Sequence, residues 1–102
     1  MGFNQQYDVP GLFDFLTNTP QAGLRKMLVD NKTFTEAHFN LLTKVLSACD
    51  VTKFCDHAEK TDFPKIKLGP AETKIKEKFW TDCFNCLQAK GLLNPAQKKT
   101  AA

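Results

Sequence analysis

The side chains of this sequence that could do chemistry together are its four cysteines, which fall into two close pairs. Cys49 and Cys55 form the first pair, and Cys83 and Cys86 form the second as a C-x-x-C motif. His57 follows the first pair by two residues. Zinc prefers four tetrahedral nitrogen or sulfur ligands, often supplied as two close pairs. One interpretation is therefore a zinc site made by the four cysteines, with His57 as a substitute for one of them.

A second interpretation is a pair of disulfide bonds between two antiparallel helices, Cys49 to Cys86 and Cys55 to Cys83. This arrangement resembles the twin-cysteine helical hairpins of the mitochondrial intermembrane space, and disulfides would imply an oxidising compartment. The spacings within the two pairs are six and three residues. On straight helices this leaves a mismatch of about 4.5 Å, which a break near Asp50 would absorb.

A third interpretation, which we favour, is that the cysteines are free thiols buried in a core. Cysteine is among the most buried residue types and behaves as a small hydrophobic side chain. Cys49, Cys83 and Cys86 each lie on the apolar stripe of a predicted helix. A redox C-x-x-C usually sits at a helix N-terminus, where the dipole lowers the pKa of the thiol. This motif lies far along its helix, so we do not expect a redox-active pair. We therefore expect no resident cofactor, and the alternative is a bound zinc ion.

The sequence predicts no catalytic centre. It contains no glycine-rich phosphate loop, no serine nucleophile elbow and no paired carboxylates on an apolar face. His38 lies on the apolar stripe of a predicted helix, where we expect a hydrogen-bonded boundary histidine. His57 lies beside Asp56 and Glu59, so we expect it at the surface. We therefore expect a protein that is not an enzyme.

The elements that position these residues are predicted to be helices. In the clearest one, which follows the rival caps Thr33 and Thr35, apolar residues recur at helical spacing as far as Cys49. Further helices are expected from Thr19-Pro20, over 51–60 with Asp50 as a cap, and from Pro70 to about Gly91. Residues 61–70 form an extended connector, because Pro64 and Pro70 interrupt any helix. In it, Ile66 and Leu68 should pack inwards.

The fold class that follows is all-α: a single-domain bundle of four to five helices with an extended N-terminal arm. A chain of 102 residues with 42% hydrophobic residues makes one domain with a core of its own. We expect a helical domain over 1–93, in which 1–8 is the arm, and a flexible basic tail over 94–102.

Charge and length also restrict the partners and the compartment. Residues 65–102 carry eight lysines against three acidic residues, but the single arginine, Arg25, lies far away in sequence. Nucleic-acid readers usually combine arginine with accessible aromatic rings, so we expect no nucleic-acid partner. No apolar run approaches the ~18 residues of a membrane span, and no signal or presequence pattern is present. We expect an intracellular protein, cytoplasmic or mitochondrial by an uncleaved route.

A helix-turn-helix is the weakest alternative. Residues 46–52 are loosely similar to the turn of that DNA-binding motif. Asp50, however, replaces the usual turn glycine, and Asp56 falls where an apolar residue is expected. The second helix would also carry Asp56 and Glu59 towards the phosphates, which would repel them.

The function that we predict is a non-catalytic accessory or structural subunit that binds a protein partner in a larger assembly. Large aromatic side chains exceed what the bundle requires, and aromatic anchors are typical of protein interfaces. The expected contacts are Phe3, Tyr7, Phe13, Phe15, Trp80 and Phe84. One alternative is that the arm folds over the edge formed by Trp80 and Phe84 and completes the core. The other functional alternatives are a small zinc or redox protein and, third, a DNA-binding domain. The sequence leaves a small-molecule ligand unknown.

Overall fold

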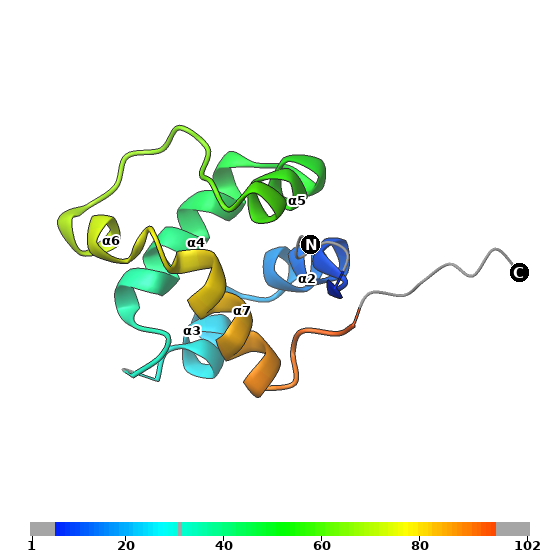
Figure 1. Cartoon of the computed structure of the whole chain (residues 1–102). Coiled ribbons are helices and arrows are strands. Elements are labelled where there is room, and N and C mark those ends of the chain that lie inside the picture. The colour runs from blue at the N-terminus through cyan, green and yellow to red at the C-terminus, as the bar shows by residue number, and fades with distance from the viewer. Residues whose placement is uncertain (1–5, 31, 96–102) are drawn as a thin grey trace, which may run out of the picture.

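A computed structural model describes residues 6–30 and 32–95 of the chain and shows an all-α domain, as the sequence predicts. The described residues contain six helices and no strand. They are α2 (Val9–Asn18), α3 (Gln21–Leu28), α4 (Glu36–Ala48), α5 (Val51–Lys60), α6 (Pro70–Ile75) and α7 (Phe79–Ala89). Figure 1 shows how they pack together. Among these residues, no helix is both long and apolar enough to cross a membrane.

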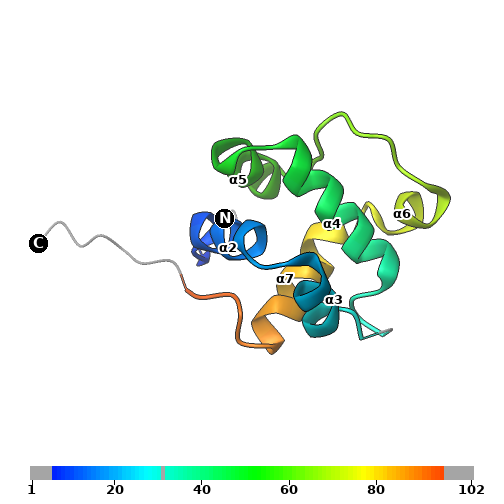
Figure 2. The same ribbon diagram turned by 180° about the vertical axis from the view of Figure 1, so that it is seen from behind.

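The longest of these helices, α4, crosses the molecule and the others pack around it (Figures 1 and 2). Its buried face carries five side chains, at His38, Phe39, Leu41, Leu42 and Val45. Of the two rival caps, Thr35 is the one that begins the helix, because its hydroxyl accepts from the N–H of His38. The 3.6-residue period predicted from the sequence therefore corresponds to the side of α4 that faces the core.

Aspartates and a glycine each set one end of a further helix, in α2, α5 and α7. The carboxylate of Asp8 accepts from the N–H of Gly11 (3.0 Å) and begins α2, and Asp50 accepts from the N–H of Lys53 (2.8 Å) and begins α5. Gly91 follows α7 with φ of 73°, the left-handed conformation expected of a terminating glycine. Thr19, which we expected to cap α3, instead donates its hydroxyl to the carbonyl of Phe15 (2.6 Å) at the end of α2.

The single helix expected from Pro70 to about Gly91 is broken into α6 and α7. Lys78 has φ −107° and ψ 2°, outside helical geometry. The N–H groups of Lys78 and Phe79 bond three residues back, at 3.0 and 3.3 Å, and so tighten the chain. A turn of this kind changes the direction of the helix axis. The side chain of Phe79 is fully buried as a result, whereas Ile75 in α6 is only half-buried.

An aromatic cluster joins α7 to α5 and to the connector over residues 61–69. The ring of Trp80 lies 5.2 Å from that of Phe79 and 5.5 Å from that of Phe54, and Phe63 stacks against Trp80 at 5.9 Å. The indole N–H of Trp80 donates to the carbonyl of Asp62 (2.8 Å). Trp80 therefore contributes apolar area to the core and also fixes the start of the connector.

The two ends of the described chain are joined. Tyr7 forms an isolated bridge with Pro95, and the N–H of Asp8 donates to the carbonyl of Asn94 (2.9 Å). The tyrosine ring packs 6.1 Å from that of Phe84. We expected an arm over 1–8 and a tail over 94–102, but these four contact residues belong to the folded domain. The remaining parts of the arm and tail, residues 1–5 and 96–102, lie outside the described residues.

Replacement of Tyr7 tests this closure. Tyr7→Ala removes the ring from Phe84 and should lower the free energy of unfolding by about 2 kcal/mol. Tyr7→Phe keeps the ring and loses only the exposed hydrogen bond to Gln88, so it should cost about 1 kcal/mol or less. Urea denaturation measures both. An alanine variant as stable as the parent would show that residue 7 is an unpacked arm.

Candidate functional site

The aromatic edge of α7 that we expected to bind a partner is covered within the monomer. The side chains of Trp80 and Phe84 are each only 3% exposed. Tyr7 packs against Phe84, as in the alternative in which the N-terminal segment completes the core. These three residues therefore contribute to the stability of this conformation, and their rings are not presented at its surface.

The other predicted contacts lie in or before α2. Phe13 is half-buried and its ring lies 5.1 Å from that of Phe54 in α5. Phe15 is 36% exposed. The other predicted contacts that the structure describes are buried or half-buried. Phe3 lies outside the described residues. One isolated exposed ring is common on protein surfaces and does not by itself define an interface.

None of the four cysteines takes part in a disulfide bond in this structure. Cys83 and Cys86 are buried on α7, and the thiol of Cys86 points to the carbonyl of Leu28 at 4.0 Å. Cys49 and Cys55 are half-buried. Desolvation raises the pKa of all four thiols, most strongly that of Cys83. Because the thiolate is the nucleophile and the metal ligand, a raised pKa lowers the fraction of each thiol that is in the reactive form at neutral pH.

The described residues bring together no group of three or more His, Cys, Asp or Glu side chains that could hold a metal ion. His57, the expected substitute ligand, is paired through Nδ1 with the carboxylate of Asp62 (2.6 Å). The structure therefore does not assemble the zinc site that was the alternative prediction. In its place, the histidine links the end of α5 to the start of the connector.

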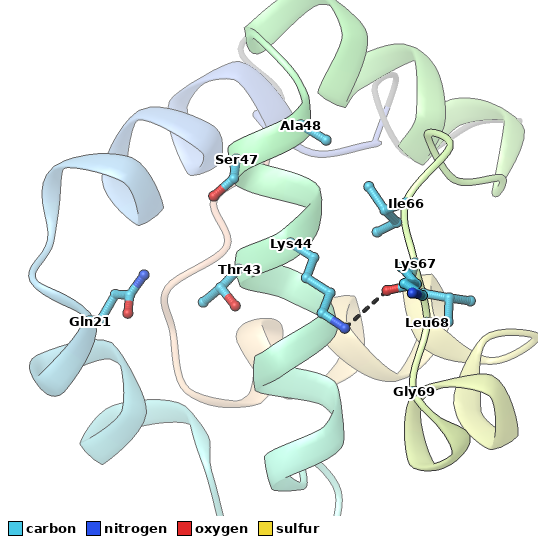
Figure 3. A pocket seen from close by; sticks show the side chains of 9 residues that line it. All are labelled: Gln21, Thr43, Lys44, Ser47, Ala48, Ile66, Lys67, Leu68 and Gly69. Atoms are coloured by element: carbon cyan, nitrogen blue, oxygen red, sulfur yellow. Dashed lines mark hydrogen bonds between the residues drawn. The ribbon is translucent and has the colours of Figure 1, made fainter.

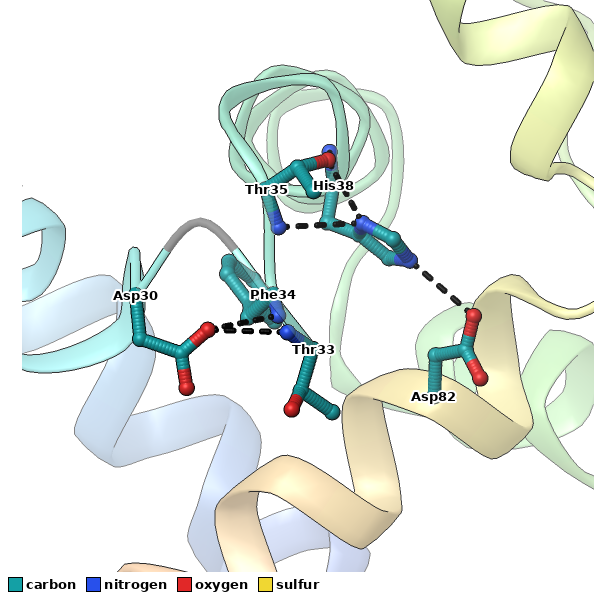
Figure 4. A network of polar contacts seen from close by, with 6 residues as sticks. All are labelled: Asp30, Thr33, Phe34, Thr35, His38 and Asp82. Atoms are coloured by element: carbon teal, nitrogen blue, oxygen red, sulfur yellow. Dashed lines mark hydrogen bonds and ion pairs between the residues drawn. The ribbon is translucent and has the colours of Figure 1, made fainter.

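His38 forms a polar chain that has the residue types of a catalytic triad but a structural geometry (Figure 4). Its Nδ1 accepts from the backbone N–H of Thr35 (3.2 Å) and lies 2.9 Å from the hydroxyl of Thr35. Because Nδ1 is an acceptor, Nε2 carries the proton and donates to Asp82 (3.2 Å). This threonine is the N-cap of α4, and the imidazole is 4% exposed. The chain joins α4 to α7, and the threonine hydroxyl in it also accepts from the N–H of His38 as the helix cap.

The turn before α4 is organised by one carboxylate, also drawn in Figure 4. An oxygen of Asp30 accepts from the N–H groups of Lys32, Thr33 and Phe34 at 3.0, 2.9 and 3.2 Å. These bonds stabilise the ionised form and lower the pKa of Asp30 to about 2. The same turn places the side chain of Phe34 in the core, where it is fully buried.

A groove lies on the surface of the protein beside α4 (Figure 3). It has a volume of about 720 Å³ and opens to solvent between α4 and the connector. Its lining comes from Gln21 of α3, from Thr43, Lys44, Ser47 and Ala48 of α4, and from Ile66, Lys67, Leu68 and Gly69 of the connector. The lining combines aliphatic and neutral polar side chains with two lysines.

A smaller hollow of about 170 Å³ continues this groove along α4 towards α2. It shares Gln21, Thr43 and Ser47 with the larger one and adds apolar surface from Leu16 and Leu46. The two hollows therefore lie next to each other along α4. We call the larger of them the α4 groove.

Lys44 and Glu72 hold the far wall of the α4 groove in place. The ammonium of Lys44 donates to the carbonyl of Lys67 (3.0 Å), as Figure 3 shows, and to Glu72 (2.6 Å). The carboxylate of Glu72, 6% exposed, also accepts from the N–H of Gly69 (2.8 Å). The N–H of Gly69 first and Lys44 second lower the pKa of Glu72. These contacts tie the connector to α4 and α6.

The sequence indicates half of this site. The alternation of lysine and aliphatic residues over 65–68 predicts that Ile66 and Leu68 pack inwards, and both are half-buried against the core. It does not indicate the role of Lys44, which lies on α4 next to Thr43 and Ser47 and looks like an ordinary solvated residue. The only signal that could have identified Lys44 is a buried acid elsewhere, and Glu72 is not recognisable as buried from its neighbours.

Comparison with known proteins does not extend this description. No family of known sequences matches the chain, no curated protein is similar to it, and no solved structure is significantly similar to its fold.

The thiols provide a test of the buried-core interpretation. Cys83→Ala should lower the free energy of unfolding by about 1–2 kcal/mol, because it leaves a cavity in a fully packed site. Cys49→Ala, at a half-buried position, should cost less than about 1 kcal/mol. Urea denaturation compares the two variants, and a chelator should change neither curve. Unfolding by the chelator would instead identify a metal-dependent fold.

The Asp30 turn predicts a pH dependence. The pKa of Asp30 in the folded protein, about 2, lies below its ordinary value of 3.8. The ionised group therefore stabilises the native state above about pH 4, and this contribution disappears as the pH falls towards 2. The stability difference between the parent and Asp30→Asn should shrink over that range in urea denaturation. Asp14→Asn, on the exposed face of α2, is the control for net charge. A difference that stays constant with pH would contradict the assignment.

Proposed function

We propose that this protein is a non-catalytic accessory subunit of a larger assembly and that it binds a partner protein through the α4 groove. The observation that carries the proposal is the groove itself. It has a volume of about 720 Å³, it opens to solvent, and its lining includes the exposed side chains of Ser47, Ala48 and Lys67.

The side chains that could have supported catalysis support the proposal by their use elsewhere. His38 is committed to the cap of α4 and to Asp82, and His57 is paired with Asp62. The thiols have raised pKa values and are buried or half-buried. A binding role needs none of these groups, and the α4 groove contains none of them.

The shape of the depression favours a protein over a small molecule. Small-molecule sites usually enclose most of the ligand surface, whereas the α4 groove opens to solvent along α4 and continues into the hollow beside Leu16. A segment of polypeptide can follow such a surface and contact both parts. The exposed side chains of Ser47 and Ala48 lie on the route.

A photo-crosslinking residue placed at Ala48 tests the proposal. The full-length chain carrying it should form one discrete adduct with a partner protein in the cells that make it, and mass spectrometry identifies the adduct. The matched control carries the same residue at Asn85, which is exposed on α7 outside the groove. Ser47→Arg in the Ala48-labelled chain should abolish the adduct by filling the groove.

Two outcomes would contradict the proposal. One is no discrete adduct from position 48, and the other is equal labelling from positions 48 and 85. The crosslinker at Phe15 tests the remaining exposed aromatic contact in the same experiment. A discrete adduct from position 15 alone would move the interface from the α4 groove to α2.

A further inference from the structure

We infer that the segment bound in the α4 groove is an acidic, extended stretch of the partner protein in which aliphatic side chains alternate with carboxylates. This inference rests on the proposed function and adds the chemistry of the partner. Three properties of the groove lead to it: its charge, its apolar lining and the unpaired main chain of its wall.

The charge of the groove has one sign. Its charged lining residues, Lys44 and Lys67, are both basic. The nearby carboxylate of Glu72 is buried and already bonded to Lys44 and to the N–H of Gly69. Lys65 adds an exposed ammonium to the same connector. Because Glu72 neutralises Lys44, carboxylates in the partner would meet the positive charge of Lys67 and of Lys65 beside it, which favours both encounter and register.

The apolar part of the lining lies between those lysines. Ile66 and Leu68 alternate with Lys65 and Lys67 along the connector and are half-buried, and Ala48 faces them from α4. Figure 3 shows the side chain of Ile66 on the side of the connector that faces α4, and that of Leu68 on its other side in this view. An aliphatic side chain of the partner would cover this remaining apolar surface at about 25 cal/mol per Å². The same two-residue alternation in the partner would bring carboxylates to the lysines.

The connector also presents main-chain groups to pair with. The N–H and C=O groups of Ile66 and Leu68 make no hydrogen bond to any residue that the structure describes. Addition of an extended segment to such a free edge is a common mode of peptide recognition. Residues 66–68 lie between a bend at Lys65 and the start of α6 and form no strand themselves, so a partner segment would pair with the main chain of these three residues alone.

The wall is already held in its binding shape. Trp80 fixes the connector at Asp62, Glu72 fixes it at Gly69, and Lys44 holds the carbonyl of Lys67 between those points. Association then orders the partner segment but has little of this protein to order. A nucleic acid fits this surface less well, because the lining contains neither an arginine nor an aromatic ring on which a base could stack.

Fluorescence anisotropy with labelled synthetic peptides tests the inference on the full-length protein. The probes are an eight-residue peptide of alternating Glu and Leu, its Gln/Leu and Lys/Leu counterparts, a single-stranded oligonucleotide and dodecanoate as a competitor. We expect the Glu/Leu peptide to bind at least about tenfold more tightly than the Gln/Leu peptide, with an affinity that falls as salt is added.

Charge-reversal variants test whether the peptide binds in the α4 groove. Lys67→Glu should lower the affinity for the Glu/Leu peptide about tenfold or more. The same variant should bind the Lys/Leu peptide more tightly than the parent does. Its main-chain bond to Lys44 is unaffected by the substitution. Lys53→Glu on α5 changes the net charge equally outside the groove and should leave both affinities unchanged. Lys67→Gln supplies a second variant if thermal melting shows that the glutamate variant does not fold.

Several results would overturn the inference. They are equal binding of the Glu/Leu and Gln/Leu peptides, equal loss in the Lys67 and Lys53 variants, tighter binding of the oligonucleotide, or binding of dodecanoate with no peptide. A discrete crosslink at position 48 combined with any of these leaves the proposed function standing and removes only the acidic partner. Loss of the crosslink removes the proposed function itself.

Discussion

The buried carboxylate of Glu72 is the interaction on which the surface beside α4 depends. It receives the N–H of Gly69 and the ammonium of Lys44, from the connector and from the middle of α4. A buried carboxylate that is left without these donors would cost several kcal/mol, so the three groups hold one another in place. Without them the connector would be held by the bond between Trp80 and Asp62 and by the packing of Phe63, Ile66 and Leu68 against the core, and its polar attachment to α4 would be lost.

Much of the local structure follows from the sequence, because it depends on near neighbours. The helix over 36–48, the cap at Asp50 and the left-handed Gly91 are each set by residues within one turn. The break between α6 and α7 could not be predicted in this way. The apolar period runs through Lys76–Lys78 without interruption, and the chain turns there because Phe79 and Trp80 are packed by distant residues, among them Phe54 and Phe63.

The candidate site shows the same division. The alternation over 65–68 reveals which side of the connector faces the core, but the groove exists because Lys44 meets residues more than twenty positions away. The wide apolar arc of α7 suggested an exposed aromatic surface, whereas the structure buries Trp80 and Phe84, for a similar reason. A wide apolar arc shows that a helix must be covered, and whether Tyr7 or another protein covers it depends on tertiary packing.

The bridge between Tyr7 and Pro95 has a topological consequence. The two ends of the described chain therefore lie next to each other, and both connect to the rest of the polypeptide at the same place on the domain. In Figures 1 and 2 that point lies away from α6 and the connector. A host protein could therefore carry this domain as an insertion, or a surface could hold it by either end, with the α4 side still presented to solution.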